Sequence, residues 1–254
     1  MKYFLSIAAS DSSGGAGIQQ DNRIALQKKY GALNILTAVT AQNYEKVIDT
    51  SVVNDDIFAK QMEIIFSSFI INTIKIGVVS TINQAKIINN YIKNFKGFIV
   101  YDPVIKSSSG FDFSNNCIEI FNAITDGLND NLIVTPNINE LEVISDKSII
   151  NKLDILNVLS SLKTLYKCSF YIKGGHFLNE QIMEFFYYKN EIYEFSFPRY
   201  EWIYSHGTGC AFSSILSINL TNSLNKLNMS QIINNSHNDL VNLFDDLNKK
   251  QAVT

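Results

Sequence analysis

The chain has 254 residues, of which 46% are hydrophobic and 18% are charged. This composition is typical of a folded globular protein and excludes the disordered and fibrous classes. With 21 basic and 24 acidic residues the net charge is −3, and no local cluster of Lys and Arg predicts a nucleic-acid-binding surface.

The predicted elements alternate between short apolar runs and longer segments of helical period. The first apolar run, residues 1–9, is too short for a secretory signal and predicts a buried strand. Strands are expected at residues 3–8, 34–40, 74–79, 98–102, 132–135 and 169–173, and helices at 16–30, 55–69, 83–94, 152–166, 209–222 and 231–248. Residues 181–186 and 191–197 predict a hairpin near the edge of the sheet. The alternation predicts a mostly parallel sheet flanked by helices, in a single domain over residues 1–254.

The segment 10–21, which includes Asp21, follows the first strand and opens a helix. Its glycines let the backbone approach a ligand closely, and the helix N-terminus offers free N–H groups. The segment matches neither a dinucleotide fingerprint nor a Walker loop. A plain strand-to-helix turn is the alternative interpretation.

The segment 206–214 leads into an apolar helix. Gly207 and Gly209 flank Thr208, a pattern that can fold into a nest of backbone N–H groups for an anion. Cys210 stands in the first helical turn, where a lowered thiol pKa is expected. The alternative is a glycine-rich turn followed by a buried cysteine.

Polar residues also follow three other predicted strands. Asn137 and Glu140 are three residues apart at the start of a possible helix, where they could hold Mg²⁺ or simply cap the helix. Asp102 ends a strand just before a proline, either as a ligand-binding group or as an ordinary turn residue. Lys173 ends another strand and could reach a phosphate, or be a solvated lysine. His176, close by, receives no role.

The cysteines and the lengths of the apolar runs indicate in which cellular compartment the protein acts. Cys117, Cys168 and Cys210 are odd in number and form no CxxC pair, which argues against a disulfide framework or a zinc site and predicts a cytoplasmic protein. No apolar run approaches the roughly 18 residues needed to span a bilayer, so no membrane association is expected.

Taken in order, the motifs resemble those of hydroxymethylpyrimidine kinases of the ribokinase-like superfamily. The resemblance covers about residues 5–216. The matching segments are Ser-Asp-Ser-Ser-Gly-Gly-Ala-Gly-Ile-Gln at 10–19, Thr-Ala-Val-Thr-Ala-Gln-Asn at 37–43, Lys-Ile-Gly at 75–77, Asp-Pro-Val at 102–104, Thr-Pro-Asn-x-x-Glu at 135–140, Lys-Gly-Gly-His at 173–176 and His-Gly-Thr-Gly-Cys at 206–210. They are highly specific for the superfamily and moderately specific for the pyrimidine branch, because some bacterial pyridoxal kinases are similar.

The resemblance implies a three-layer α/β/α fold, ATP and Mg²⁺ as cofactors, a homodimer, and transfer of phosphate to a hydroxymethylpyrimidine and then to its monophosphate. It assigns ring binding to Asp21, Gln42, Val78 and Val104. It assigns Mg²⁺ to Asp102, Asn137 and Glu140, directly or through water. Nucleotide binding falls to Lys173, Thr208 and Asn137, and the anion hole to Gly207, Gly209 and the N–H of Cys210, which occupies the position of a catalytic aspartate in sugar kinases.

Four departures from the family pattern bear on the substrate. Ala9 and Lys46 replace usual glycines, and Lys106 replaces a usual apolar residue. The segment around Trp202 is less polar than is usual before the glycine-rich turn. Three hypotheses follow: a hydroxymethylpyrimidine (phosphate) kinase of thiamin synthesis, a pyridoxal kinase, and a nucleotide- or pyrimidine-binding protein without catalysis.

Overall fold

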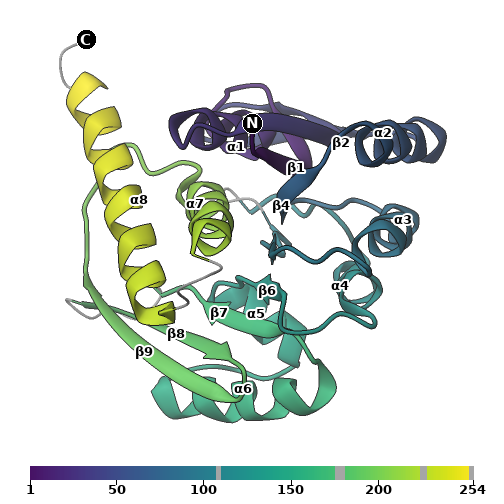
Figure 1. Ribbon diagram of the computed structural model, residues 1–254. Helices are drawn as coiled ribbons and strands as arrows, with labels where there is room; N and C mark the ends of the chain where they lie inside the picture. Colours follow the sequence, from purple (N-terminus) through teal and green to yellow (C-terminus); the bar gives the residue numbers. More distant parts are fainter. Residues whose placement is uncertain (107–109, 175–180, 224–227, 252–254) are drawn as a thin grey trace.

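The computed structural model describes residues 1–106, 110–174, 181–223 and 228–251 (Figure 1). Its strands all belong to one sheet, in the order β3-β2-β1-β4-β5-β6-β7-β8-β9. The strands are β1 (Tyr3–Asp11), β2 (Gly31–Gln42), β3 (Val47–Val52), β4 (Ile71–Ile76), β5 (Ile99–Tyr101), β6 (Leu132–Val134), β7 (Ser169–Ile172), β8 (Gln181–Tyr188) and β9 (Glu191–Pro198). The helices are α1 (Gly17–Gln27), α2 (Asp55–Ser68), α3 (Ile82–Ile92), α4 (Cys117–Thr125), α5 (Ile138–Ser145), α6 (Lys152–Leu165), α7 (Thr208–Asn222) and α8 (Met229–Gln251).

The sheet is parallel in its middle and antiparallel at both edges. In the sheet order β2-β1-β4-β5-β6-β7, every pair of neighbouring strands is parallel. At one edge, β3 pairs antiparallel with β2. At the other edge, β8 and β9 pair antiparallel with β7 and with each other, as the predicted hairpin requires. Lys189 and Asn190 connect β8 to β9 with φ of 47° and 66°, the conformation that lets a two-residue turn match strand twist.

Helices cover both faces of the sheet, which confirms the three-layer α/β/α architecture (Figure 1). On one face, apolar side chains of α2 to α6 pack against the strands in one buried cluster. On the other face, α1, α7 and α8 bury a second cluster. The middle strands are buried on both sides, so β5, β6 and β7 expose almost nothing. Apolar runs without alternation therefore mark the strands that lie at the centre of the sheet.

The sequence interpretation missed two elements. Strand β3 is an edge strand whose side chains are mostly exposed, so it has no apolar run to identify it. Helix α4 is short and follows a loop that interrupts any longer helical period. Both lie outside the strong periodic signal, and neither changes the order of the parallel strands.

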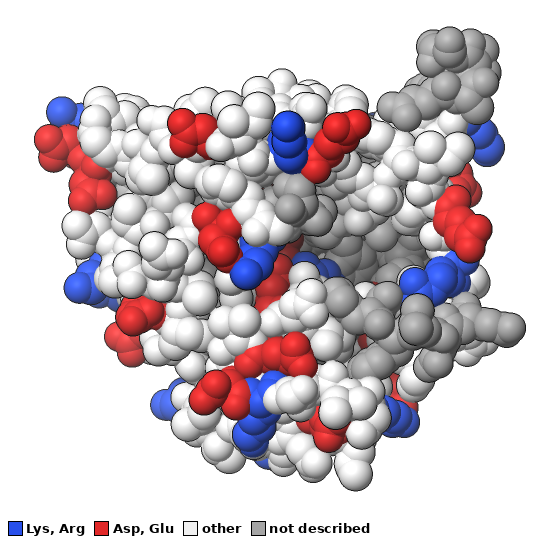
Figure 2. Space-filling view, turned by 180° about the vertical axis from the view of Figure 1, so that it is seen from behind, with Lys and Arg blue, Asp and Glu red and all other residues white. Residues whose placement is uncertain are grey.

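The distribution of surface charge and the hydropathy of the helices are two further features of the fold. Basic and acidic side chains are interspersed over the face seen in Figure 2. Within the described ranges, no helix combines the length and apolar character that a membrane span requires.

Candidate active site

A cavity of about 160 Å³ opens at the carboxyl ends of the parallel strands. Polar groups in or just after β1, β2, β4, β5, β6 and β7 meet there with the N-terminus of α7, because parallel strands direct their ends to one edge of the sheet. All the predicted site residues except Asp21 line this cavity: Gln42, Val78, Asp102, Val104, Asn137, Glu140, Lys173, Gly207, Thr208, Gly209 and Cys210. Their individual roles stay predictions.

Lys173 joins two buried carboxylates at one side of the cavity. Its Nζ lies 2.6 Å from Asp102 Oδ1 and 3.8 Å from Glu140 Oε2. Burial alone would lower the pKa of Lys173, but the two carboxylates outweigh burial and raise it. Burial raises the pKa of Glu140 to about 7; Lys173 opposes this shift and Asp102 adds to it. When Glu140 is ionised the cluster holds two carboxylates against one ammonium, so a further cation would favour the ionised form of Glu140.

Asn137 and Glu140 form a capping box at the start of α5. Asn137 Oδ1 accepts from the Glu140 N–H at 2.9 Å, and Glu140 Oε2 accepts from the Asn137 N–H at 2.8 Å. The capping alternative is thus confirmed, yet both side chains also line the cavity. The cap fixes their direction, so a local structural role and a place in the site coexist.

The turn before α7 faces the charged cluster. Gly207 has φ of 83°, and a Cβ there would lie 1.9 Å from the carbonyl oxygen of Gly15, so only glycine fits. A Cβ at Gly209 would lie 3.6 Å from Lys173 Nζ and 3.9 Å from Asp102 Oδ2. The N–H groups of Gly209 and Cys210 have no acceptor among the described residues. The N-terminus of α7, with its free donors and the positive end of the helix dipole, thus lies beside the Lys173–Asp102 pair.

The thiol of Cys210 does not have the lowered pKa that its place in the helix suggested. Burial raises the pKa of this thiol, and the carboxylates of Asp102 and Asp21 add to the rise. The Lys75 ammonium and the Gly17 N–H lower the pKa only in part. Desolvation thus outweighs the helix N-terminus, and the group is a thiol at neutral pH.

Asp21 lies beneath the cavity and not in its wall. Each of its carboxylate oxygens is 3.0 Å from Lys75 Nζ, and the hydroxyls of Ser6 and Ser214 also donate to it. Asp21 and Lys75 are both 0% exposed. A hydrogen bond between Asp21 and a pyrimidine stays a prediction: the carboxylate accepts from Lys75, and Lys75 is the member of this pair that lines the cavity.

Sequence reasoning gave no role to Lys75, although a signal existed. Lys75 stands between Ile74 and Ile76 in a buried strand, and a charge in such a place needs a partner. Its ion pair with Asp21 raises the pKa of Lys75 against the lowering effect of burial. Lys75 stays charged at the floor of the cavity.

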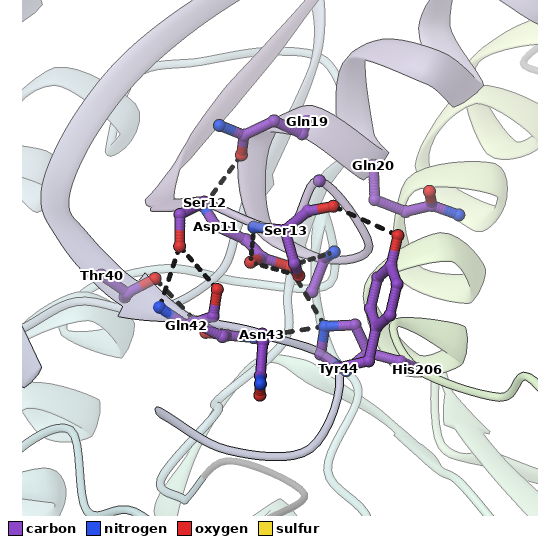
Figure 3. A network of polar contacts seen from close by, with 12 residues as sticks. Asp11, Ser12, Ser13, Gln19, Gln20, Thr40, Gln42, Asn43, Tyr44 and His206 are labelled. Atoms are coloured by element: carbon purple, nitrogen blue, oxygen red, sulfur yellow. Dashed lines mark hydrogen bonds and ion pairs between the residues drawn. The ribbon is translucent and has the colours of Figure 1, made fainter. Parts of the chain in front are cut away.

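A second network, shown in Figure 3, was also missed. Asp11 Oδ1 accepts from the N–H and the hydroxyl of Ser13, and Oδ2 accepts from the Ala16 N–H and faces His206 Nε2. Burial raises the pKa of Asp11, but these hydrogen bonds, first that of His206, lower it to about 2. The signal was a serine two residues after an aspartate, which is typical of an Asx turn.

The four positions at which the sequence departs from the family pattern differ in their location relative to the cavity. Ala9 lines it, so the extra methyl narrows the space where the family has glycine. Lys106 also lines it and pairs with Asp112 at 3.3 Å. Lys46 closes a hydrogen-bonded turn with Asn43. Trp202 stacks on α8 and donates to Asp245, outside the cavity lining. His176 lies outside the described residues.

Comparisons with known proteins agree with this geometry. Residues 11–232 match the family model described as phosphomethylpyrimidine kinase. A hydroxymethylpyrimidine/phosphomethylpyrimidine kinase of Aquifex aeolicus is 31% identical over 217 residues, which cover 85% of this chain and 84% of that protein.

Solved structures share the same fold. The crystal structure of a phosphomethylpyrimidine kinase from Clostridium difficile 630 is 28% identical, with a TM-score of 0.78 over 96% of this chain and 99% of that one. A pyridoxal kinase of Staphylococcus aureus, in complex with AMP-PCP and pyridoxal, is 22% identical, with a TM-score of 0.80 over 95% and 87% of the two chains. The family model spans most of the sequence, and the chain belongs to the phosphomethylpyrimidine kinase family.

Proposed function

We propose that this protein transfers the γ-phosphoryl group of ATP to the hydroxymethyl group of 4-amino-5-hydroxymethyl-2-methylpyrimidine, and then to the resulting monophosphate, in thiamin biosynthesis. One observation carries the proposal: the Lys173–Asp102 pair lines the same cavity as the N-terminus of α7, where the N–H groups of Gly209 and Cys210 have no acceptor among the described residues. Phosphoryl transfer requires alignment and charge neutralisation above all, and this arrangement supplies both. Family membership supports the choice of the pyrimidine alcohol.

The nucleotide would lie between the turn before α7 and the end of β7. In this proposal the Lys173 ammonium contacts the phosphates, and Thr208 and Asn137 donate hydrogen bonds to them. The N–H groups of Gly209 and Cys210 hold the transferred group while its charge is spread over its oxygens. The S. aureus pyridoxal kinase, which shares this fold, has been solved in complex with AMP-PCP. That complex supports the proposal that ATP is the nucleotide here.

The two buried carboxylates fit a magnesium ion shared with the nucleotide. Among the described residues no group of three His, Cys, Asp or Glu side chains is arranged to hold a metal by itself. Magnesium in kinases usually takes one or two carboxylates together with phosphate oxygens and water, and the excess negative charge at Asp102 and Glu140 matches that pattern. These residues would hold the ion, with Asn137 acting through water. When bound, Mg²⁺ would neutralise part of the negative charge of the phosphates.

The pyrimidine would occupy the other half of the cavity. Val78 and Val104 offer apolar contacts on the ring, and the Gln42 amide offers one donor and one acceptor to its edge. Cys210 then lies beside the alcohol. Since its thiol stays protonated, we propose that Cys210 orients the hydroxyl and that the backbone N–H groups provide most of the stabilisation.

The test is turnover by the purified protein with ATP and Mg²⁺. The pyrimidine alcohol, its monophosphate and pyridoxal are supplied in parallel, and products are identified by mass. Formation of the mono- and diphosphate with a higher kcat/KM than for pyridoxal supports the proposal. A preference for pyridoxal establishes the vitamin B6 alternative, and nucleotide binding without any product establishes the inactive binding protein.

We also propose that the protein is a single-domain, cytoplasmic homodimer. The free state of Cys117, Cys168 and Cys210 suits a reducing compartment. The edge strand β3 exposes Ile48 and Val52 by 68% and 42%, an apolar surface that a second copy could cover. Light scattering after size exclusion tests this state: wild type should have the mass of two chains, and Ile48→Glu should shift it toward one.

A further inference from the structure

His206 lies where three separate segments meet (Figure 3). It precedes Gly207, and its Nε2 is 3.1 Å from Asp11 Oδ2 at the end of β1 and 3.2 Å from Gln42 Nε2 at the end of β2. The side chain is only 14% exposed. One nitrogen atom therefore contacts both a carboxylate and an amide that lines the cavity.

The contact with Asp11 decides where the proton on this nitrogen is. Asp11 accepts hydrogen bonds from the Ser13 N–H, the Ser13 hydroxyl and the Ala16 N–H, at 2.8, 2.7 and 2.8 Å. These three donors are independent of His206 and together reach both carboxylate oxygens, so Asp11 is an ionised carboxylate with no proton to donate. Hence His206 Nε2 must carry a hydrogen and donate it, because a bare nitrogen would face the carboxylate with lone pair against lone pair.

A hydrogen on Nε2 leaves no acceptor for the amide nitrogen of Gln42. Rotation of the amide by half a turn exchanges its oxygen and nitrogen, which ordinary structural data do not distinguish. The oxygen then shares the single Nε2 hydrogen with Asp11 Oδ2, as the second acceptor of a bifurcated bond. The nitrogen then faces Thr40 Oγ1, which is 3.3 Å from the other end of the amide and gives its own hydrogen to the Ser10 carbonyl at 2.9 Å. Every donor in the network then has an acceptor.

We infer that His206 is a positioning residue that fixes the Gln42 amide with its oxygen toward His206 and its nitrogen toward Thr40. This inference rests on the proposed function for its consequence. The amide then offers the cavity an acceptor on the side of the Gly207 turn and a donor on the side of Thr40. An aminopyrimidine edge, with its amino donor beside a ring-nitrogen acceptor, pairs with such an amide in one direction only. A pyridine alcohol without the amino group cannot complete the pair.

The kinetic test compares His206→Leu with His206→Gln. Leucine removes the donor, whereas glutamine places an amide N–H at a similar reach. For His206→Leu we expect KM for the pyrimidine alcohol to rise about 3- to 10-fold, the change expected from one lost hydrogen bond. The preference over pyridoxal should fall by the same factor, while kcat and KM for ATP change less. His206→Gln should recover most of the preference. An unchanged preference in His206→Leu overturns the specificity role.

A spectroscopic test is independent of activity. Nitrogen-15 NMR of the wild-type protein reports which ring nitrogen of each of its three histidines carries hydrogen, and the spectrum of His206→Gln assigns the signal of His206. A hydrogen on Nε2 supports the inference, and a hydrogen on Nδ1 alone overturns it. If the wild type shows this hydrogen but phosphorylates no pyrimidine, the proposed function fails while the orientation of Gln42 stands. If His206→Gln does not fold, His176→Gln and His237→Gln assign the other two signals and leave that of His206 by elimination.

Discussion

Cys210 is subject to opposing electrostatic effects. The N-terminus of α7 and the Lys75 ammonium favour a thiolate, whereas burial and the carboxylates of Asp102 and Asp21 favour the thiol. Burial is the largest of these effects. The residue that the proposed function places beside the alcohol is therefore a thiol and not a thiolate at neutral pH, and this has a direct kinetic consequence.

The first prediction concerns the balance between side chain and backbone in catalysis. We expect Cys210→Ala to lower kcat by about tenfold or less, below the 10²–10⁴-fold range typical of a lost general base. Gly209→Val should lower kcat by at least about 10²-fold, because its methyl groups would enter the space between the free N–H groups and Lys173. Gly209→Ala is the matched control, since its Cβ makes only ordinary contacts. A loss of 10³-fold or more in Cys210→Ala would instead assign the base role to the thiol.

The second prediction follows from the lowered pKa of Asp11. The folded value is about 2, below the ordinary 3.8, so ionised Asp11 stabilises the folded state above pH 3.8, and this contribution is lost as the pH falls through about 2. Asp11→Asn should therefore reduce the free energy of unfolding most near neutral pH, and its deficit relative to wild type should shrink on acidification. Urea unfolding of both proteins at several pH values measures this. A deficit that stays constant as the pH falls would contradict this prediction.

At the scale of elements, the start of α5 serves both stability and the site. Its capping box fixes Asn137 and Glu140 at the cavity wall. Helix α6 begins with a second capping box, at Asn151 and Asp154, where both residues lie outside the cavity lining. The two boxes have the same local chemistry, so they separate the effect of capping from the effect of contact with a ligand.

The third prediction uses this pair. Asn137→Ala and Asn151→Ala should each lower the free energy of unfolding by about 1 kcal/mol, the usual effect of losing a side-chain cap. Only Asn137→Ala should also reduce kcat/KM and raise KM for ATP. Asn137→Asp should keep the stability because aspartate caps equally well. Equal kinetic losses in both alanine variants would show that Asn137 acts only through the helix.

The elements also show which parts of a fold a sequence reveals. Strands β5, β6 and β7 were predictable because burial on both faces requires uninterrupted apolar residues. Strand β3 was not predictable, because it forms through pairing with β2 and its own composition does not identify it as a strand. In the site, glycines and strand-ending polar residues identified the cavity. The direction of Asp21 was not predictable, since it depends on Lys75, 54 residues away.

On the scale of the whole molecule, the cavity is built from segments that span residues 8–210 of the chain. No short segment of the chain supplies all the residues that line the cavity. Ligand binding and global folding are therefore coupled, because a ligand that contacts the ends of several strands and α7 binds only the complete sheet.

The fourth prediction tests this coupling together with the metal. A non-hydrolysable ATP analogue with Mg²⁺ should raise the unfolding temperature, with a stabilisation of about 2.7 kcal/mol at 100 times its dissociation constant. Removal of Mg²⁺ by EDTA should reduce the shift and abolish turnover. Glu140→Gln should make the shift less dependent on Mg²⁺, whereas the exposed variant Glu119→Gln should not. Equal shifts with and without Mg²⁺ would contradict the assignment of the metal to Asp102 and Glu140.

The buried pair of Lys75 and Asp21 limits how this sequence can diverge. Either residue alone, without the other, would be an uncompensated charge in the interior, which destabilises a fold by about 3–5 kcal/mol. Folded proteins are stable by only about 5–15 kcal/mol, so such a loss removes a large part of the total. Descendants of this gene must therefore retain both ions or exchange them nearly simultaneously, and across related genomes the two positions should covary.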